Sequence, residues 1–214
     1  MLKIWGRASS ANVQKVLWLA AELGITYEHV SVGGSFGGLN EPSFRVLNPH
    51  GRVPVLQDGD TAIWESHTIV RYLAARYGDG SLWPADPLAR AQMDEWMDWA
   101  QTAFQPDFLN GVFWGYFRTP EAQRNWPAIH DSVKRCSRHI ERIDAILAGR
   151  PFLAGNFSLA DIPLGTLLYR YYELDIEHPR APHVEAWYGR LNERPAYRQH
   201  VMVSFEELRG RLSF

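Results

Sequence analysis

The sequence has few of the features expected of secreted or membrane proteins. Its 214 residues include a single cysteine, Cys136, so no disulfide can form within the chain, and this favours a reducing compartment. No apolar run reaches the about 18 residues needed to cross a membrane, and no apolar stretch follows the N-terminus as in a secretion signal. We therefore expect a cytoplasmic protein that does not enter a membrane.

An excess of one charge is also absent. Lys and Arg total 22 against 24 Asp and Glu, a net charge of -2, so we expect no nucleic-acid partner. The eight histidines show no metal-ligand spacing, so no metal ion is expected. Hydrophobic residues make up 46% and aromatic residues 13% of the chain, which excludes intrinsic disorder and indicates a large apolar core.

The first third of the chain alternates between short β-like runs and helical patterns. The expected elements are a strand at 2–5, a helix from Val13 to Gly24, a strand at 27–32, a helical turn at 42–47, a hairpin of 53–56 and 61–64 around 58–60, and a helix from Ser66 to 77. This order is typical of an α/β layer structure.

After a segment rich in Gly and Pro, the apolar spacing becomes helical throughout. Two long amphipathic helices are predicted, from Leu88 to Phe104 and from Ile129 to Leu147. A capping box at 158–161 opens another helix, and His183–Leu191 is one more. We therefore predict a first domain at 1–78, a linker at 79–87 and an all-helical domain at 88–214.

Two features of the first domain suit a peptide ligand. Val53-Pro54 precedes an apolar strand, where a proline either makes a simple bend or holds a tight turn whose backbone groups pair with an extended peptide. Glu65 and Ser66 lie at a helix N-terminus, which favours a carboxylate, although Ser66 alone reads more simply as a helix cap.

These motifs together resemble a known family. Asn48–Leu56 (NPHGRVPVL), Trp64–Leu73 (WESHTIVRYL) and the 158–161 capping box after 151–155 are similar to the cytosolic glutathione transferases, of the bacterial, theta-like type. The resemblance implies a thioredoxin-like N-terminal domain followed by an α-helical one, a cis peptide before Pro54 and a homodimer. It also implies glutathione as co-substrate, a small hydrophobic electrophile as second substrate, and no metal.

The resemblance assigns glutathione-binding roles to named positions. The backbone of Val53, beside Pro54, would pair with the cysteinyl part, while Glu65 and Ser66 would hold the γ-glutamyl end. Arg52 would meet the glycyl carboxylate through its guanidinium, and His50 is a weaker candidate. A further glycine-rich loop at 33–38 is either a lid over this site or a simple connector.

The group that activates the thiol is sought near the end of the first strand. The first tyrosine is Tyr27 and the only cysteine is Cys136, so neither a tyrosine-type nor a cysteine-type site fits. The segment 7–15 resembles the serine-type pattern with a Ser-x-Asn motif. It puts Ser10 in the hydroxyl position, with Asn12 where proline is usual and Ser9 as a third candidate; all three have helix capping as the alternative role.

Aromatic residues crowd the end of the first long helix. The rings expected at the electrophile pocket are Phe108, Phe113, Trp114 and Phe117. Asn110, Gly111 and Gly115 are expected to break the helix there and turn some rings toward a cleft, whereas the alternative is that the rings form core. Cys136 is expected to be inert core.

The expected function is transfer of glutathione, activated as its thiolate, to an apolar electrophile. Two alternatives stay open: a glutathione-dependent peroxidase or disulfide reductase, and a binding module with this fold but without catalysis. The second substrate is not specified by the sequence.

Overall fold

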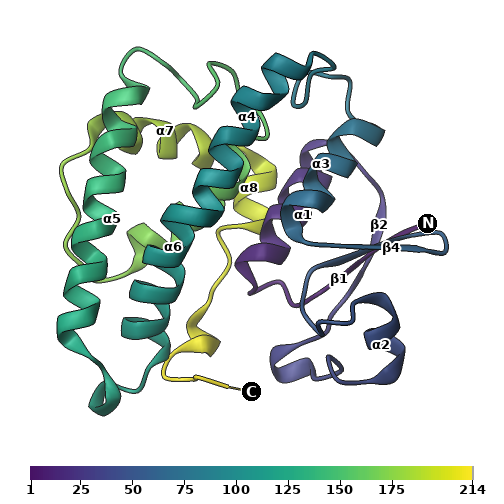
Figure 1. Ribbon diagram of the computed structural model, residues 1–214, viewed down its shortest axis with the longest axis horizontal. Helices are drawn as coiled ribbons and strands as arrows, with labels where there is room; N and C mark the ends of the chain where they lie inside the picture. Colours follow the sequence, from purple (N-terminus) through teal and green to yellow (C-terminus); the bar gives the residue numbers. More distant parts are fainter. Residues whose placement is uncertain (214) are drawn as a thin grey trace. The chain divides into compact units, whose positions relative to one another are not determined.

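The computed structural model describes residues 1–213, which form two compact units (Figure 1). The first unit comprises Met1–Pro84, Ala196–Val203 and Ser213, and the second comprises Ala85–Pro195 and Ser204–Leu212. The predicted linker at 79–87 stays a prediction. Residues 196–203, expected in the helical domain, belong to the first unit, where Tyr197 packs edge-on against Trp18 with ring centroids 4.8 Å apart.

The first unit has the predicted order of strands and helices. Its elements are β1 (Leu2–Trp5), α1 (Ala11–Glu22), β2 (Tyr27–Val30), η1 (Gly34–Phe36), α2 (Pro42–Leu47), β3 (Val55–Asp58), β4 (Thr61–Trp64), α3 (Ser66–Tyr77) and most of α8 (Pro195–His200). The sheet order is β2-β1-β3-β4, with β1 parallel to β2, and β3 antiparallel to both β1 and β4. The thioredoxin-like arrangement is confirmed.

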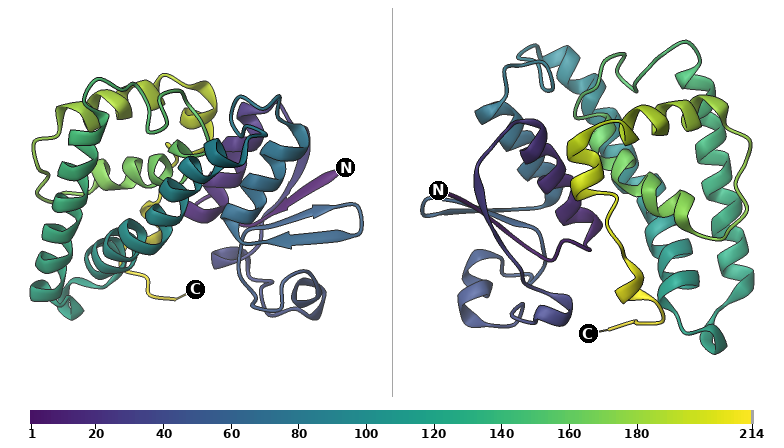
Figure 2. Two further views of the ribbon diagram at one scale, coloured as in Figure 1. Left: turned by 45° about the horizontal axis from the view of Figure 1, so that its top comes forward. Right: turned by 180° about the vertical axis from the view of Figure 1, so that it is seen from behind.

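Both faces of this sheet are covered, because alternate strand residues are buried against different helices. α1 and α3 lie side by side over one face (Figure 2), where Ile4 and Leu56 are 1% exposed or less. Val55 packs instead with Phe44 of α2, and Trp5 also reaches Phe44, with ring centroids 6.2 Å apart. The period of two along the strands thus builds two apolar layers.

The start of α3 differs from the sequence expectation. Ser66 is already helical, and Glu65 takes the N-cap position with a positive φ of 70°. Ser66 therefore does not cap the helix; it is 5% exposed in the first turn. The chain must turn sharply from β4 into α3, and Glu65 absorbs that turn.

The second unit is built from helices, as predicted, with one isolated β-bridge between Ala154 and Asn156. Its elements are α4 (Pro87–Trp99), the π-helical segments η2 (Ala100–Phe104) and η3 (Pro106–Arg118), η4 (Glu121–Gln123), α5 (Trp126–Leu147), α6 (Asp161–Glu173), α7 (Pro182–Asn192) and η5 (Glu206–Leu208). The capping box is present: the Asp161 carboxylate accepts the Ser158 N–H at 3.0 Å, although α6 itself begins only at Asp161.

The predicted break at Asn110, Gly111 and Gly115 is wrong, because the chain stays helical to Arg118. Both glycines instead allow α5 to approach closely. A Cβ at Gly111 would overlap the side chain of Ser132, and one at Gly115 would lie 3.2 Å from Ile129 Cγ1. Pro106 has no N–H to donate inside this helix, and π-helical residues lie on both sides of it.

Candidate functional site

Three chain segments leave the sheet of the first unit at the same end. The ladder β1–β3–β4 closes there with the pairs Trp5–Val55 and Val55–Trp64. The loop after Trp5, the residues before Val55 and those after Trp64 therefore emerge together. These are the segments that carry the candidate thiol-activating and glutathione-binding residues.

The loop after β1 leads into α1 through Ser9 and Ser10. Ser10 is the N-cap residue of α1, with extended backbone (φ -85°, ψ 122°), but its hydroxyl makes no capping hydrogen bond. Ser9 is 8% exposed, whereas Ser10 and Asn12 are half-buried. The alternative role of Ser10 as a side-chain cap is thus absent, and its hydroxyl is available to a ligand.

Asn12 belongs to a buried polar cluster that joins α1 to α3. Lys15 Nζ donates to Asn12 Oδ1 at 3.0 Å and lies 3.2 Å from His67 Nε2. Lys15 is 1% exposed and His67 is 4% exposed. The cluster therefore ties the N-terminal halves of the two helices together at the end of the sheet where the candidate site lies.

Burial controls the protonation of this cluster. Removal from water lowers the pKa of Lys15 from 10.5 to about 7, although the nearby negative charge of Glu65 opposes this. Removal from water also lowers the pKa of His67 to about 2, helped by the charges of Lys15 and Arg71. His67 is therefore neutral near pH 7, where Lys15 changes its charge.

The loop before β3 contains the predicted cis peptide, Val53-Pro54, which is confirmed. Asn48 holds this loop: its Nδ2 donates to the Arg52 carbonyl at 2.9 Å, and its Oδ1 accepts the His50 N–H at 3.0 Å. Gly6, which follows β1, lies so close that a Cβ there would be 3.0 Å from Val53 Cβ. The Val53 backbone thus lies beside the loop that leads to Ser10.

Glu65 and Ser66 complete the same end of the sheet. Among residues 1–213, Glu65 is the one non-glycine residue with a positive φ, and such a conformation is unfavourable unless the surroundings impose it. It directly precedes the free N–H groups of α3, which has 12 residues. The positive end of this helix favours a bound carboxylate.

Arg52 and His50 lie at the outer edge of this group. Both side chains are exposed, and the His50 ring packs edge-on against Trp64, with centroids 5.1 Å apart. Arg52 lies near Val53 because the two residues are adjacent in the sequence.

The four rings predicted for the electrophile pocket do not share one environment. Phe108, Phe113 and Phe117 are each at most 2% exposed, and Phe113 and Phe117 both pack against Phe205. They form core of the helical unit, because the helix continues through the glycines that were expected to open it. Trp114 is 36% exposed, with the Arg118 guanidinium 3.7 Å from its ring centroid.

The remaining sequence expectations concern Cys136, metals and membranes. Cys136 is fully buried, and burial raises the pKa of its thiol to about 12, so it is inert core as predicted. Residues 1–213 contain no group of three or more His, Cys, Asp or Glu arranged to hold a metal ion. None of the helices in that range combines the length and apolar character needed to cross a bilayer.

Sequence reasoning missed the contacts that Lys15, His67 and Asn48 make at this end of the sheet. The sequence did contain a signal that Lys15 is buried. It lies among apolar residues of the same helix, and its neighbours Val13, Val16 and Leu17 are all buried. His67 and Asn48 lie within the two motifs that carry the resemblance, but their contacts depend on the tertiary fold and not on spacing.

Comparison with known proteins identifies the family of the chain. Residues 5–81 match the family profile "Glutathione S-transferase, N-terminal domain", and residues 93–195 match "Glutathione S-transferase, C-terminal domain". The chain is 38% identical over 206 residues to glutathione S-transferase GstB of Escherichia coli K12, which covers 95% of this chain and 99% of that protein. It is 32% identical over 212 residues to glutathione S-transferase 3 of Zea mays, covering 94% and 93%.

A solved structure extends the likeness to three dimensions. The theta class glutathione S-transferase of Xanthomonas axonopodis pv. citri, crystallised with glutathione bound, superposes with a TM-score of 0.90 at 48% identity, covering 95% of this chain and 98% of that one. Both family profiles lie in the expected order and together span most of the sequence. The chain therefore belongs to the glutathione S-transferase family.

Proposed function

We propose that this glutathione S-transferase binds glutathione at the end of the sheet where Ser10, Val53 and Glu65 meet, and transfers its thiolate to an apolar electrophile. The observation that carries the proposal is the shared exit of three loops beside Trp5, Val55 and Trp64. An extended tripeptide has a thiol between two carboxylate ends, and this group of residues offers a matching partner for each.

The middle of the tripeptide pairs with the Val53 backbone, in the manner of an added strand. The γ-glutamyl end binds Glu65, Ser66 and the N–H groups of α3, while Arg52 meets the glycyl carboxylate. The fit is supported by the exposed Arg52 side chain and by the position of Glu65 and Ser66 directly before and within the first turn of α3. No metal is needed for this chemistry.

Thiol activation falls to Ser10 and Asn12 at the start of α1. A free thiol has a pKa of about 8.5, so donors and a positive helix end must stabilise the thiolate at neutral pH. The uncommitted hydroxyl of Ser10 and the half-buried amide of Asn12 supply such donors. The thiolate then attacks the electrophile and displaces its leaving group.

The experiment that tests this function combines binding and turnover. The protein should be retained by glutathione-agarose and should conjugate chlorodinitrobenzene. Retention without turnover of that substrate, a peroxide or a disulfide would instead identify a binding module. Turnover of a peroxide or a disulfide alone would identify the reductase alternative, for which Asn12 and the absence of an accessible cysteine are the supporting features.

The assembly and location follow the family resemblance. The enzyme is proposed to be a cytoplasmic homodimer, with a buried free cysteine suited to a reducing compartment. Light scattering at micromolar concentration should report about twice the chain mass of 24.5 kDa. A monomer under those conditions would contradict the dimer without bearing on glutathione binding.

A further inference from the structure

The buried Lys15 has no place in the catalytic scheme above. It is 1% exposed and lies on the face of α1 that packs against α3. Keeping an ammonium group away from water is unfavourable unless polar partners compensate. Its contacts with Asn12 Oδ1 at 3.0 Å and His67 Nε2 at 3.2 Å link it to a residue proposed to touch the thiol.

The chemistry of the two groups determines which way the Asn12 amide faces. An ammonium group only donates hydrogen bonds, whereas a carboxamide has an accepting oxygen at one end and a donating nitrogen at the other. The contact therefore requires Oδ1 to face Lys15, because the reverse orientation would set Nδ2 against another donor. The Asn12 Nδ2 is left to point away from Lys15, and it makes no hydrogen bond within residues 1–213.

His67 holds the ammonium group in place from the side of α3. Its low pKa keeps the imidazole neutral, so Nε2 can accept a hydrogen bond from Lys15 while Nδ1 carries the proton. The buried Nδ1 has no partner among the described residues. Neutral His67 thus acts as a second acceptor that stabilises the charged form of Lys15 beside Asn12.

We propose that Lys15 is a positioning residue for thiol activation. Because its ammonium group can only donate, it fixes the Asn12 amide with Oδ1 toward Lys15 and Nδ2 toward the glutathione sulfur. This inference rests on the function proposed above. In this scheme Asn12, which shares thiol activation with Ser10, is a group that touches the sulfur, and Lys15 acts only through Asn12. The effect disappears when Lys15 becomes a neutral amine, which can accept as well as donate and so permits both orientations of Asn12.

The groups around Lys15 define the expected pH response. Asn12 faces it from α1, His67 from α3, and the Glu65 carboxylate acts from the residue before α3, with Arg71 acting on His67. Burial brings the pKa of Lys15 to about 7. We expect kcat to rise with pH as the thiol ionises and then to fall as Lys15 loses its proton.

The test compares Lys15→Met, Asn12→Ala and the double variant with Lys3→Met as control. Lys3 pairs with Glu28 across two neighbouring strands and is 39% exposed, so its loss should leave the site unchanged. In Lys15→Met we expect about tenfold less thiolate on bound glutathione at neutral pH, about tenfold lower kcat and no alkaline fall. Binding of S-methylglutathione, which has no thiol, should change less than twofold and also reports that the site is folded.

The decisive result is the double variant. If Lys15 acts through Asn12, Lys15→Met has no further effect on kcat or on the thiol titration once Asn12 is alanine. Effects that multiply, or a Lys15→Met protein whose bound thiol titrates as in the wild type, would overturn the proposal. If the wild-type protein binds neither glutathione nor S-methylglutathione, the proposed function itself fails. The binding measurement therefore distinguishes this failure from a failure of the role proposed for Lys15.

A second variant covers the case in which Lys15→Met does not fold. Asn12→Asp keeps an acceptor for Lys15 but removes the outward Nδ2 donor. We expect it to fold, to bind S-methylglutathione and to raise the pKa of the bound thiol at least as much as Asn12→Ala. A wild-type titration in Asn12→Asp would contradict the proposed orientation.

Discussion

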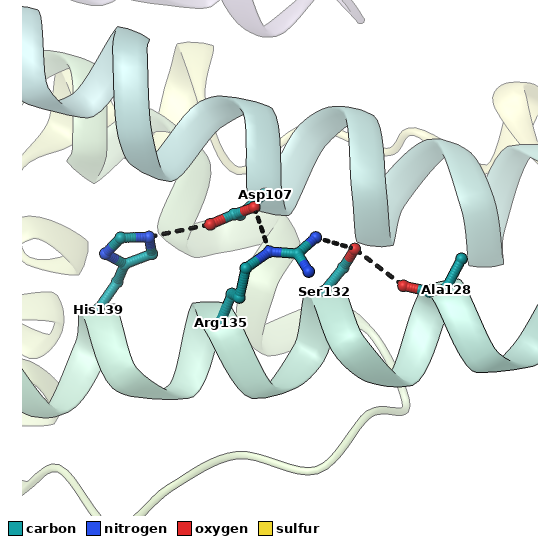
Figure 3. Close-up of polar contacts among 5 residues, drawn as sticks. All are labelled: Asp107, Ala128, Ser132, Arg135 and His139. Atoms are coloured by element: carbon teal, nitrogen blue, oxygen red, sulfur yellow. Dashed lines mark hydrogen bonds and ion pairs between the residues drawn. The ribbon is translucent and has the colours of Figure 1, made fainter.

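Asp107 of η3 accepts a hydrogen bond from His139 of α5, with 3.0 Å between Oδ2 and Nε2 (Figure 3). The other carboxylate oxygen accepts from Arg135 Nε at 2.6 Å, and Arg135 also donates to Ser132 Oγ at 2.8 Å. One carboxylate thus joins two successive turns of α5 to the π-helical segment. Burial opposes its ionisation, but the hydrogen bonds and charges of Arg135 and His139 outweigh burial and lower the pKa of Asp107.

The first prediction concerns this carboxylate. Asp107→Asn should lower the free energy of unfolding by about 1 kcal/mol at neutral pH, since the group is partly exposed and solvent screens it. Because the folded pKa lies below the unfolded value, the contribution is present above about pH 4 and is lost as the pH falls through the folded pKa. Urea unfolding from pH 3 to 7 measures it, with Asp175→Asn in an exposed loop as control. A difference between wild type and variant that is constant across this range would contradict the assignment.

The second prediction concerns the close approach of η3 and α5. Gly111→Ala should destabilise the protein by about 1 to 3 kcal/mol, because the new Cβ would lie 2.8 Å from Ser132 Cβ. Ser132 cannot easily move, since its hydroxyl donates to the Ala128 carbonyl at 3.0 Å and accepts from Arg135 (Figure 3).

The control for Gly111→Ala is Gly189→Ala in α7, where nothing lies within 4 Å of the new Cβ. That change should stabilise by about 0.5 to 1 kcal/mol, as expected for glycine in a helix interior. Equal effects of the two changes in thermal unfolding would argue against the close approach.

Local patterns predicted most of the first unit correctly. The hairpin around Gly59, with φ of 59°, and the short helix at Pro42 depend on neighbouring residues alone, and both are present. The bounds shifted where tertiary contacts decide them, as at β3, which begins at Val55 after the cis Val53-Pro54 bond. Register and turn chemistry therefore suffice for the order of elements but not for their ends.

The helical unit shows what a single sequence does not reveal. From its neighbours in sequence, a glycine within a helix predicts a weak point. At Gly111, however, the space beside the backbone is filled by the side chain of Ser132 from the later helix α5. The same limit applies to Lys15, whose partner His67 lies 52 residues away. Such positions are explained by contacts between distant segments, which periodicity does not encode.

The third prediction concerns the γ-glutamyl end of the proposed site. Ser66→Ala should weaken glutathione binding by about 1.5 to 3 kcal/mol, the size of a lost hydrogen bond to a charged group, while the maximal rate changes less. The matched control is Thr68→Ala, which removes an exposed hydroxyl two residues further along α3. Calorimetry with glutathione gives both affinities. Unchanged affinity in both Ser66→Ala and Glu65→Ala would show that this end of the site is wrongly assigned.

The last prediction separates Ser10 from Asn12 and Ser9 in thiol activation. A donor aimed at the sulfur stabilises the thiolate more than the thiol, so its removal should raise the pKa of the bound thiol and lower turnover more than binding. If the Ser10 hydroxyl acts alone, Ser10→Ala should raise the activation barrier by roughly 2 to 4 kcal/mol, as for an oxyanion donor.

The absorbance of bound thiolate against pH in Ser9→Ala, Ser10→Ala and Asn12→Ala decides among them. The variant that moves the titration upward carries the role, and nearly buried Ser9 is expected to move it least. If none of the three moves it, the N–H groups at the start of α1 stabilise the thiolate, and the assignment to side chains is wrong.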